Sequence, residues 1–278
     1  MADGEGAGVL RARSPRFSTG DAPRYWWGGN PLATHLVNGV CLLFPSGERF
    51  FIRSVRHFAD RVDDPGLRSQ VQGFYAQEAR HGAAHQRQFD DLRSQGYAVD
   101  GFLRWYEGLA WSGIEPRVSP ALRLAVTVAL EHYTALLAHD VLAGDGLEAV
   151  APEVRALLQW HAAEEIEHKS VAFDVLRAVA PSYGLRVAGL GLATAGLLGF
   201  WAVATGGLLL QDWRAGRRPQ ARDVDTLRAQ VQHIGGGMLL GGIRAYLRRD
   251  FHPSQLDDAA LAAAYLASAG LEPAGENA

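Results

Sequence analysis

The strongest constraint on the fold is a set of long segments with clear helix start and stop signals. Helices are expected to begin where a capping residue precedes a proline, because proline suits the first helical position. The start pairs are Asp64-Pro65, Ser119-Pro120 and the weaker Ala151-Pro152, and the stop signals are Gly96, Gly144 and Pro181. These signals predict four long helices over residues 31–62, 65–95, 120–143 and 152–179.

Two details modify this four-helix pattern. Pro45 lies inside the first segment and is expected to kink or break it. A shorter helix near residues 100–112 connects the second and third segments. Because no useful run alternates apolar and polar residues, we expect an all-α fold built around a four-helix bundle. The predicted organisation is a flexible N-terminal segment (1–29), a helical bundle (30–180) and a hydrophobic C-terminal helical region (181–278).

Composition excludes several classes of function. The formal net charge is −3 and no basic patch stands out, so we expect no nucleic-acid partner. Cys41 is the only cysteine, which excludes a disulfide framework and a thiolate zinc site. The N-terminal residues include acids and lack an apolar core, so they do not resemble a secretory signal. We therefore expect a cytoplasmic protein.

The region 187–210 differs from the bundle because it contains no charged residue over 24 positions. A helix of this length, about 36 Å, is long enough to cross a bilayer. The segment is also rich in glycine, as expected for a hydrophobic helix or hairpin packed on the bundle or in a homodimer interface. Membrane association through 187–210 and internal packing both remain open. A second apolar run at 234–243 is too short to span.

Polar side chains recur at helical spacing where the bundle should be most buried. Glu78 and His81 lie three residues apart in the second segment. His161, Glu165 and His168 follow one another at i, i+4 and i+7 in the fourth, so their directions agree within about 60°. The pair in the second segment and the trio in the fourth therefore each occupy one face of their helix.

The other two long segments each supply one carboxylate. Glu131 stands inside the apolar run LAVTVALEHYTALLA, and Glu48 follows the kink in FPSGERFFI. A carboxylate buried in such a run is costly unless another group compensates it. Two Glu-x-x-His helices plus two single glutamates are the ligand inventory of di-metal carboxylate bundles. Four carboxylates also balance two divalent ions, so we predict a two-metal centre.

The ligand types favour iron, with manganese as the alternative. Imidazoles mixed with carboxylates and no thiolate suit these metals. Zinc is satisfied by fewer ligands, and magnesium prefers oxygen over three imidazoles. Four further residues lie beside the predicted ligands. His85 is either a hydrogen-bond donor to a ligand or a ligand itself, and Glu164 either replaces Glu165 as a ligand or contacts the ligands from outside. Tyr75 and Thr127 border a substrate pocket or pack in the core.

The string His-x-x-x-Glu-x-x-His in the fourth segment resembles the di-iron aminobenzoate N-oxygenases, which carry seven protein ligands including an extra histidine. The resemblance implies a ferritin-like bundle with these metal ligands: Glu48, Glu78, His81, Glu131, His161, Glu165 and His168. The strings LLFPSGERFFIRSVR, QEARHGAAH, ALEHYTA, WHAAEEIEHKSVAFDV and YLRRDFHP resemble the bacterial family of predicted metal-dependent hydrolases, from about residue 30 to 253.

Three functions follow from these patterns. The first is a di-iron oxygenase that uses dioxygen and an external electron donor to oxidise a small or hydrophobic substrate, with amine N-oxygenation implied by the resemblance. The second is a hydrolase that uses a metal-activated water. The third is a non-enzymatic bundle that binds metal or oxygen. The residues name no substrate.

Overall fold

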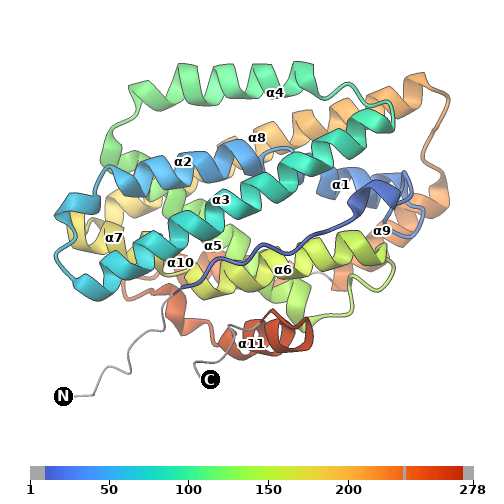
Figure 1. Cartoon of the computed structure of the whole chain (residues 1–278). Helices are drawn as coiled ribbons and strands as arrows, with labels where there is room; N and C mark the ends of the chain where they lie inside the picture. Colours follow the sequence, from blue (N-terminus) through green and yellow to red (C-terminus); the bar gives the residue numbers. More distant parts are fainter. Residues whose placement is uncertain (1–9, 234–235, 272–278) are drawn as a thin grey trace.

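The computed structural model describes residues 10–233 and 236–271, and this part of the chain consists of helices, the loops between them and one β-bridge between Trp27 and Val150. Figure 1 shows long helices lying side by side, with α4 (Asp100–Glu107) running along one edge of the molecule. The bundle consists of α2 (Phe44–Arg56), α3 (Pro65–Ser94), α5 (Pro120–Ala143) and α6 (Pro152–His168). The all-α bundle expected from the sequence is therefore confirmed.

The predicted helix starts are observed where the capping residues stand. The Asp64 carboxylate accepts a hydrogen bond from the Leu67 amide at 2.7 Å, and the Ser119 hydroxyl accepts one from the Leu122 amide at 3.3 Å. These contacts satisfy amides that have no partner inside the helix. Ala151 has no side-chain acceptor, yet α6 still begins at Pro152.

Two predicted helices are each divided in two. The first becomes α1 (Pro31–Cys41) and α2, and Pro45 lies in the first turn of α2, where its missing donor costs nothing. The segment predicted over 152–179 becomes α6 and α7 (Val171–Val179), with the break directly after His168. No proline or glycine marks that second break in the sequence.

The C-terminal region covers one side of the bundle. α8 (Tyr183–Arg214) is one continuous helix rather than a hairpin, and it packs against α5 and α1. It is followed by α9 (Ala221–His233), α10 (Gly236–Tyr246) and α11 (Ala259–Ser268). Of the apolar run predicted at 234–243, residues 234 and 235 lie outside the described residues.

Two of the described helices are long and apolar enough to cross a membrane, namely α5 and α8. The two helices differ in how much of their apolar stretch is buried. The apolar window of α5 is 61% buried inside the bundle, as expected for a core helix, whereas only 22% of the α8 window is buried. Only α8 therefore presents an extended apolar surface to its surroundings.

The N-terminal segment, treated as flexible over residues 1–29, is described from residue 10 onward. Figure 1 shows it running along the bundle over α3 and α6. The Thr19 hydroxyl donates to the Asp91 carboxylate of α3 at 2.5 Å, and the Trp26 and Trp27 side chains are buried. This path brings Arg13 to the interior of the bundle.

Close packing of α8 on α5 gives a stability prediction. A Cβ atom added at Gly189 would lie 2.5 Å from the Ala125 backbone, so Gly189→Ala is expected to lower the free energy of unfolding by about 1–3 kcal/mol. The matched control is Gly191→Ala, whose added methyl group meets nothing within 4 Å. This control should be neutral or stabilising by up to about 1 kcal/mol. Urea denaturation of both variants measures the contrast, and equal stabilities would contradict the observed packing.

Candidate metal centre

The four bundle helices bring all seven predicted ligands into one buried cluster. α2 contributes Glu48, α3 contributes Glu78 and His81, α5 contributes Glu131, and α6 contributes the other three: His161, Glu165 and His168. Each of these side chains is at most 5% exposed. The helical spacing read from the sequence therefore points the seven residues toward one volume.

The cluster contains four overlapping groups of possible ligands, and two of them share Glu78. Glu78, Glu131 and His168 have potential ligand atoms within 4.8 Å of one another, and so do Glu48, Glu78 and His81. Glu78 belongs to both groups. Glu165 is similarly central, since its carboxylate lies 2.9 Å from His161 Nε2 and 3.6 Å from His168 Nε2. Two ion positions bridged by Glu78 and Glu165 are consistent with these distances.

The carboxylate oxygens test whether ions fit this cluster. Both oxygens of Glu48, Glu78 and Glu131 are buried without a hydrogen-bond partner among the described residues, and so is one oxygen of Glu165. Leaving so many acceptors unsatisfied in an apolar interior is costly. Two imidazole nitrogens, His81 Nδ1 and His168 Nε2, also lack a hydrogen-bond partner among the described residues. The residues therefore fit a pair of divalent cations.

The pKa shifts have the same physical origin. Burial raises the pKa of Glu131 to about 8, and the nearby Glu78 carboxylate adds to the rise. Burial also acts to raise the pKa of Glu165, but the histidines around it hold that pKa well below its usual range. The site thus concentrates negative charge that must be balanced by protons or by cations.

Each ligand histidine is oriented by a partner on its other nitrogen. His168 Nδ1 lies 3.0 Å from the Gln77 carbonyl oxygen, so this nitrogen donates and Nε2 faces the carboxylates. The Gln77 amide in turn donates to Glu167 at 2.7 Å. Such outer contacts fix the tautomer and the ring orientation of metal ligands.

His161 is oriented by a chain of two hydrogen bonds. His85 Nδ1 lies 2.7 Å from the Gln88 carbonyl oxygen and donates to it, which leaves His85 Nε2 as an acceptor. His161 Nδ1 lies 2.7 Å from His85 Nε2, and His161 Nε2 lies 2.9 Å from the Glu165 carboxylate and 3.9 Å from the Glu48 carboxylate. Burial lowers the pKa of His161 to about 4, which keeps the ring neutral. His85 also lies close enough to Glu48 and His161 to be a ligand itself.

Arg13 joins the partners of the other two histidines. His81 Nε2 lies 3.0 Å from the Glu164 carboxylate, whose other oxygen accepts from the Arg13 amide and guanidinium. The same guanidinium forms two hydrogen bonds, of 2.7 and 2.9 Å, with Glu167. Arg13 therefore binds both Glu164, which contacts His81, and Glu167, which contacts His168 through Gln77.

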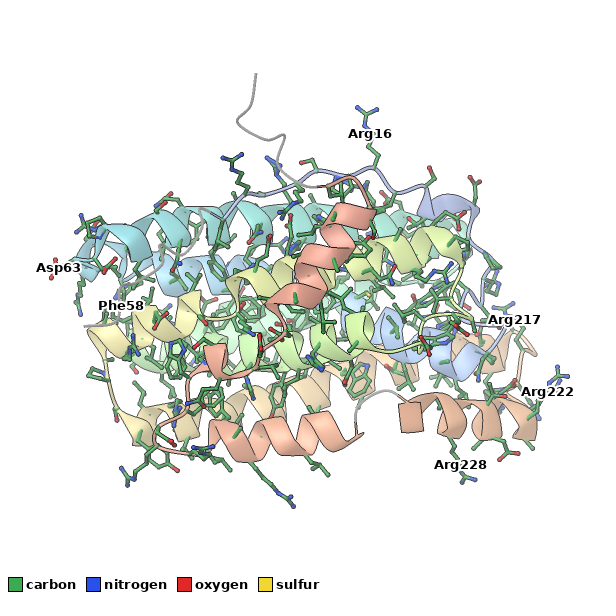
Figure 2. The ribbon with its side chains drawn as sticks, turned by 90° about the horizontal axis from the view of Figure 1, so that it is seen from below. Arg16, Phe58, Asp63, Arg217, Arg222 and Arg228 are labelled. Carbon is green, nitrogen blue, oxygen red and sulfur yellow. The ribbon has the colours of Figure 1, made fainter. Side chains whose placement is uncertain are left out.

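These contacts predict that Arg13→Ala weakens metal binding by about 10–100-fold, because Glu164 and Glu167 lose their common partner. The control is Arg16→Ala in the same segment, since Arg16 is exposed and points away from the bundle (Figure 2). Competition with a chromophoric chelator measures both affinities, and circular dichroism checks that both variants fold. Equal metal affinities of the two variants would show that Arg13 does not support the metal ligands.

Tyr75 and Thr127 lie one helical turn before Glu78 and Glu131, respectively. Their hydroxyl groups are buried and have no hydrogen-bond partner among the described residues. Burial raises the pKa of Tyr75 to about 12, so its phenol remains a donor. The Arg56 guanidinium lies 5.1 Å from the Tyr75 ring centroid. The choice between a substrate pocket and core packing for these two residues stays open, as in the sequence.

The basic residues next to ligands in sequence face elsewhere. Lys169 pairs with Asp258, and the Arg80 guanidinium donates to the Ser14 hydroxyl at 2.5 Å. Neither charge is directed at the ligand cluster. His132 also lies apart from the cluster, 3.0 Å from the Gly242 carbonyl oxygen.

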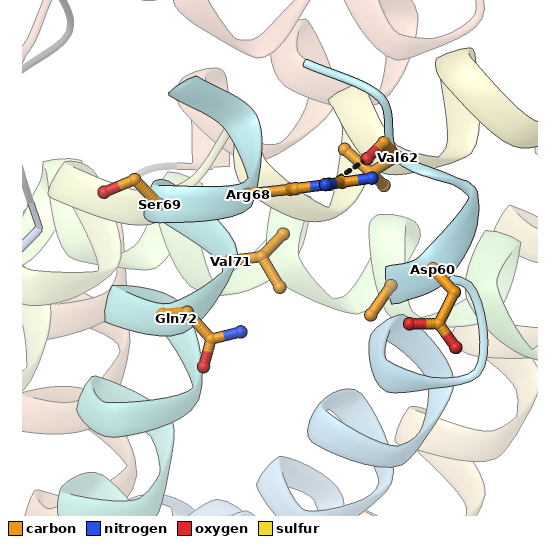
Figure 3. A pocket seen from close by; sticks show the side chains of 7 residues that line it. Asp60, Val62, Arg68, Ser69, Val71 and Gln72 are labelled. Atoms are coloured by element: carbon orange, nitrogen blue, oxygen red, sulfur yellow. Dashed lines mark hydrogen bonds between the residues drawn. The ribbon is translucent and has the colours of Figure 1, made fainter. Parts of the chain in front are cut away.

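The surface cavities do not coincide with the cluster. A cavity of about 410 Å³ lies at the α2–α3 turn (Figure 3), and its lining residues are Ala59, Asp60, Val62, Arg68, Ser69, Val71 and Gln72. Another of about 580 Å³ lies between the N-terminal segment and α3, next to Trp160. Neither cavity is lined by a candidate ligand.

Sequence reasoning missed four residues of this site: Arg13, Gln77, Gln88 and Glu167. The glutamines share a helix with His81 and His85, so their inward positions on α3 were readable from helical spacing. Arg13 had no such signal, because its contact with Glu164 joins residues 151 positions apart.

Comparison with known proteins gives one match. A family model described as "predicted metal-dependent hydrolase" matches residues 11–257. No curated protein and no solved structure matches the chain.

Proposed function

The chain belongs to the family of predicted metal-dependent hydrolases, and from this membership and the buried ligand cluster we propose a hydrolase with a two-ion catalytic centre. The observation that carries the proposal is the set of buried carboxylate oxygens without partners on four different helices. A pair of divalent ions held there would supply Lewis acidity for the activation of water and for polarising the bond to be cleaved.

The chain's own residues would hold and orient the reacting groups. Glu78 and Glu165 would hold both ions, and the outer partners of the histidines keep their free nitrogens directed inward. The hydroxyls of Tyr75 and Thr127 bind polar atoms of the substrate. Burial of the cluster excludes bulk water other than the molecule that reacts.

A second candidate is an iron-dependent oxygenase that takes dioxygen and electrons from an external donor. The observation that favours it is the ligand set itself, in which three imidazoles and four carboxylates suit iron or manganese. Lys169 and Arg80 are both paired away from the cluster, so neither of them could clamp a phosphate ester there. The family description supports hydrolysis over oxidation.

Parallel assays on metal-loaded protein separate the two candidates. Protein loaded with zinc, manganese or ferrous iron is incubated with ester, amide and phosphoester substrates, with and without chelator. A hydrolase is expected to turn over at least one class, to lose activity with the metal and to be indifferent to dioxygen. Turnover that survives complete metal removal contradicts both candidates. Reductant-dependent dioxygen consumption by the iron form, without hydrolysis, selects the oxygenase.

A further inference from the structure

The outer face of α8 is an apolar surface that the proposed catalysis does not use. Between Arg186 and Asp212 the helix carries no charged residue. The side chains of this face are exposed by 42–53%, namely Leu192, Leu198, Val203, Leu210 and Trp213. A contiguous exposed apolar surface of this kind marks an interaction site in a soluble fold.

A neighbouring segment enlarges this surface. Trp105 of α4 lies against Phe200 of α8, with ring centroids 5.6 Å apart, and it is itself 44% exposed. Leu109 and Ile114 in the π-helical turn that follows α4 are exposed by 42% and 48%. The apolar face therefore includes side chains from two helices rather than one stripe.

The opposite face of α8 is fixed to the bundle. Gly189 lies in close contact with the Ala125 backbone, and Ala193, Ala204 and Leu208 are buried. α8 cannot cross a bilayer alone while these contacts persist. Its uncharged stretch of 25 residues, 187–211, is about 37 Å long and can instead lie flat on a surface.

Both ends of the helix carry arginines stacked on aromatic rings. Arg249 lies 4.6 Å from the Tyr183 ring centroid at the N-terminal end, and Arg218 lies 5.4 Å from the Trp213 ring centroid at the C-terminal end. The stretch 214–222 contains four arginines and no acid. Arg222 projects outward from this region (Figure 2), and Arg217 pairs with Asp212 at 2.9 Å. Aromatic rings and arginines flanking an apolar helix are typical of lipid headgroup contacts.

We propose that the outer face of α8, together with Trp105, docks flat onto an anionic phospholipid membrane. A second copy of this chain is a poorer occupant, because both ends of α8 are basic. The N-terminal end of α8 adds Arg244, Arg248 and Arg249, and of these only Arg248 pairs with an acid, Asp250, within the described part of the chain. Antiparallel or parallel pairing of two α8 helices would place like charges together, whereas anionic headgroups complement both ends.

Vesicle co-sedimentation of the full chain tests this assignment. Binding is expected to vesicles of phosphatidylcholine with phosphatidylglycerol, and to be about tenfold weaker to pure phosphatidylcholine or at high salt. The double variant Leu198→Glu/Val203→Glu should bind the anionic vesicles at least about tenfold more weakly. The control, Leu137→Glu, alters a side chain of similar exposure on α5 and should bind as the parent does.

Two results would overturn the assignment. One is the absence of binding to any vesicle. The other is a dimer without lipid, seen by analytical ultracentrifugation, that the double variant converts to monomer; this result assigns the face to a second copy. Metal content and circular dichroism are recorded for every variant, so that loss of the fold or of the metal centre is distinguished from loss of docking.

Discussion

Replacing Glu78 by alanine is expected to reduce metal content from about two ions per chain to about zero. Glu78 is the only carboxylate that belongs to both the Glu48–His81 group and the Glu131–His168 group among the described residues. Its removal therefore takes a ligand from each ion at once. It also leaves the remaining charges of the cluster without a bridge.

Elemental analysis after gel filtration measures this loss. The control is Asp90→Ala on the same helix, because the Asp90 carboxylate is 76% exposed and pairs only with Arg93. This control should retain about two ions, like the parent. Retention of both ions by the Glu78 variant would show that the carboxylate is not shared and that the assigned ligand set is wrong.

Replacing Glu131 by leucine is expected to have opposite effects on stability without and with metal. In the metal-free protein both Glu131 oxygens are buried without a hydrogen-bond partner, and burial raises the pKa of this group to about 8. An apolar side chain of similar size removes that desolvation cost. Glu131→Leu should therefore raise the free energy of unfolding of the metal-free protein by about 1–3 kcal/mol.

In excess metal the order reverses. Ions that bind only the folded chain stabilise the parent by mass action, and the variant has lost one carboxylate of the His168 group. Urea denaturation in chelator and in saturating metal measures both states. If Glu131→Leu is less stable than the parent in chelator, the contact of the Glu131 carboxylate with His168 Nε2, at 3.4 Å, offsets its desolvation cost. If metal stabilises both proteins equally, Glu131 is not a ligand.

The helices and the inward positions of the cluster could be predicted because both depend on local spacing. Asp64 and Ser119 cap their helices as the sequence indicates. The i, i+4, i+7 spacing of His161, Glu165 and His168 fixes their common face whatever surrounds them. The apolar context of Glu131 then indicates that something must compensate its charge.

What the sequence could not supply are contacts between distant segments. Arg13 lies in a stretch without periodicity, and its pairing with Glu167 depends on the path of the whole N-terminal segment. The break after His168 has no proline or glycine to mark it. The surroundings of 187–210 were equally open, since the same composition suits a buried helix, a hairpin or a membrane surface. Because α8 is one continuous helix, the hairpin is excluded. One face of α8 packs on α5, and the other face is exposed.

Anomalous diffraction from crystals of the metal-loaded protein tests the central claim most directly. We expect two peaks at the metal absorption edge, about 3.5–4 Å apart, with Glu78 and Glu165 between them. One ion should contact Glu131 and His168, and the other should contact Glu48 and His81. A single peak, or peaks outside this cluster, would contradict the two-ion centre on which the proposed function depends.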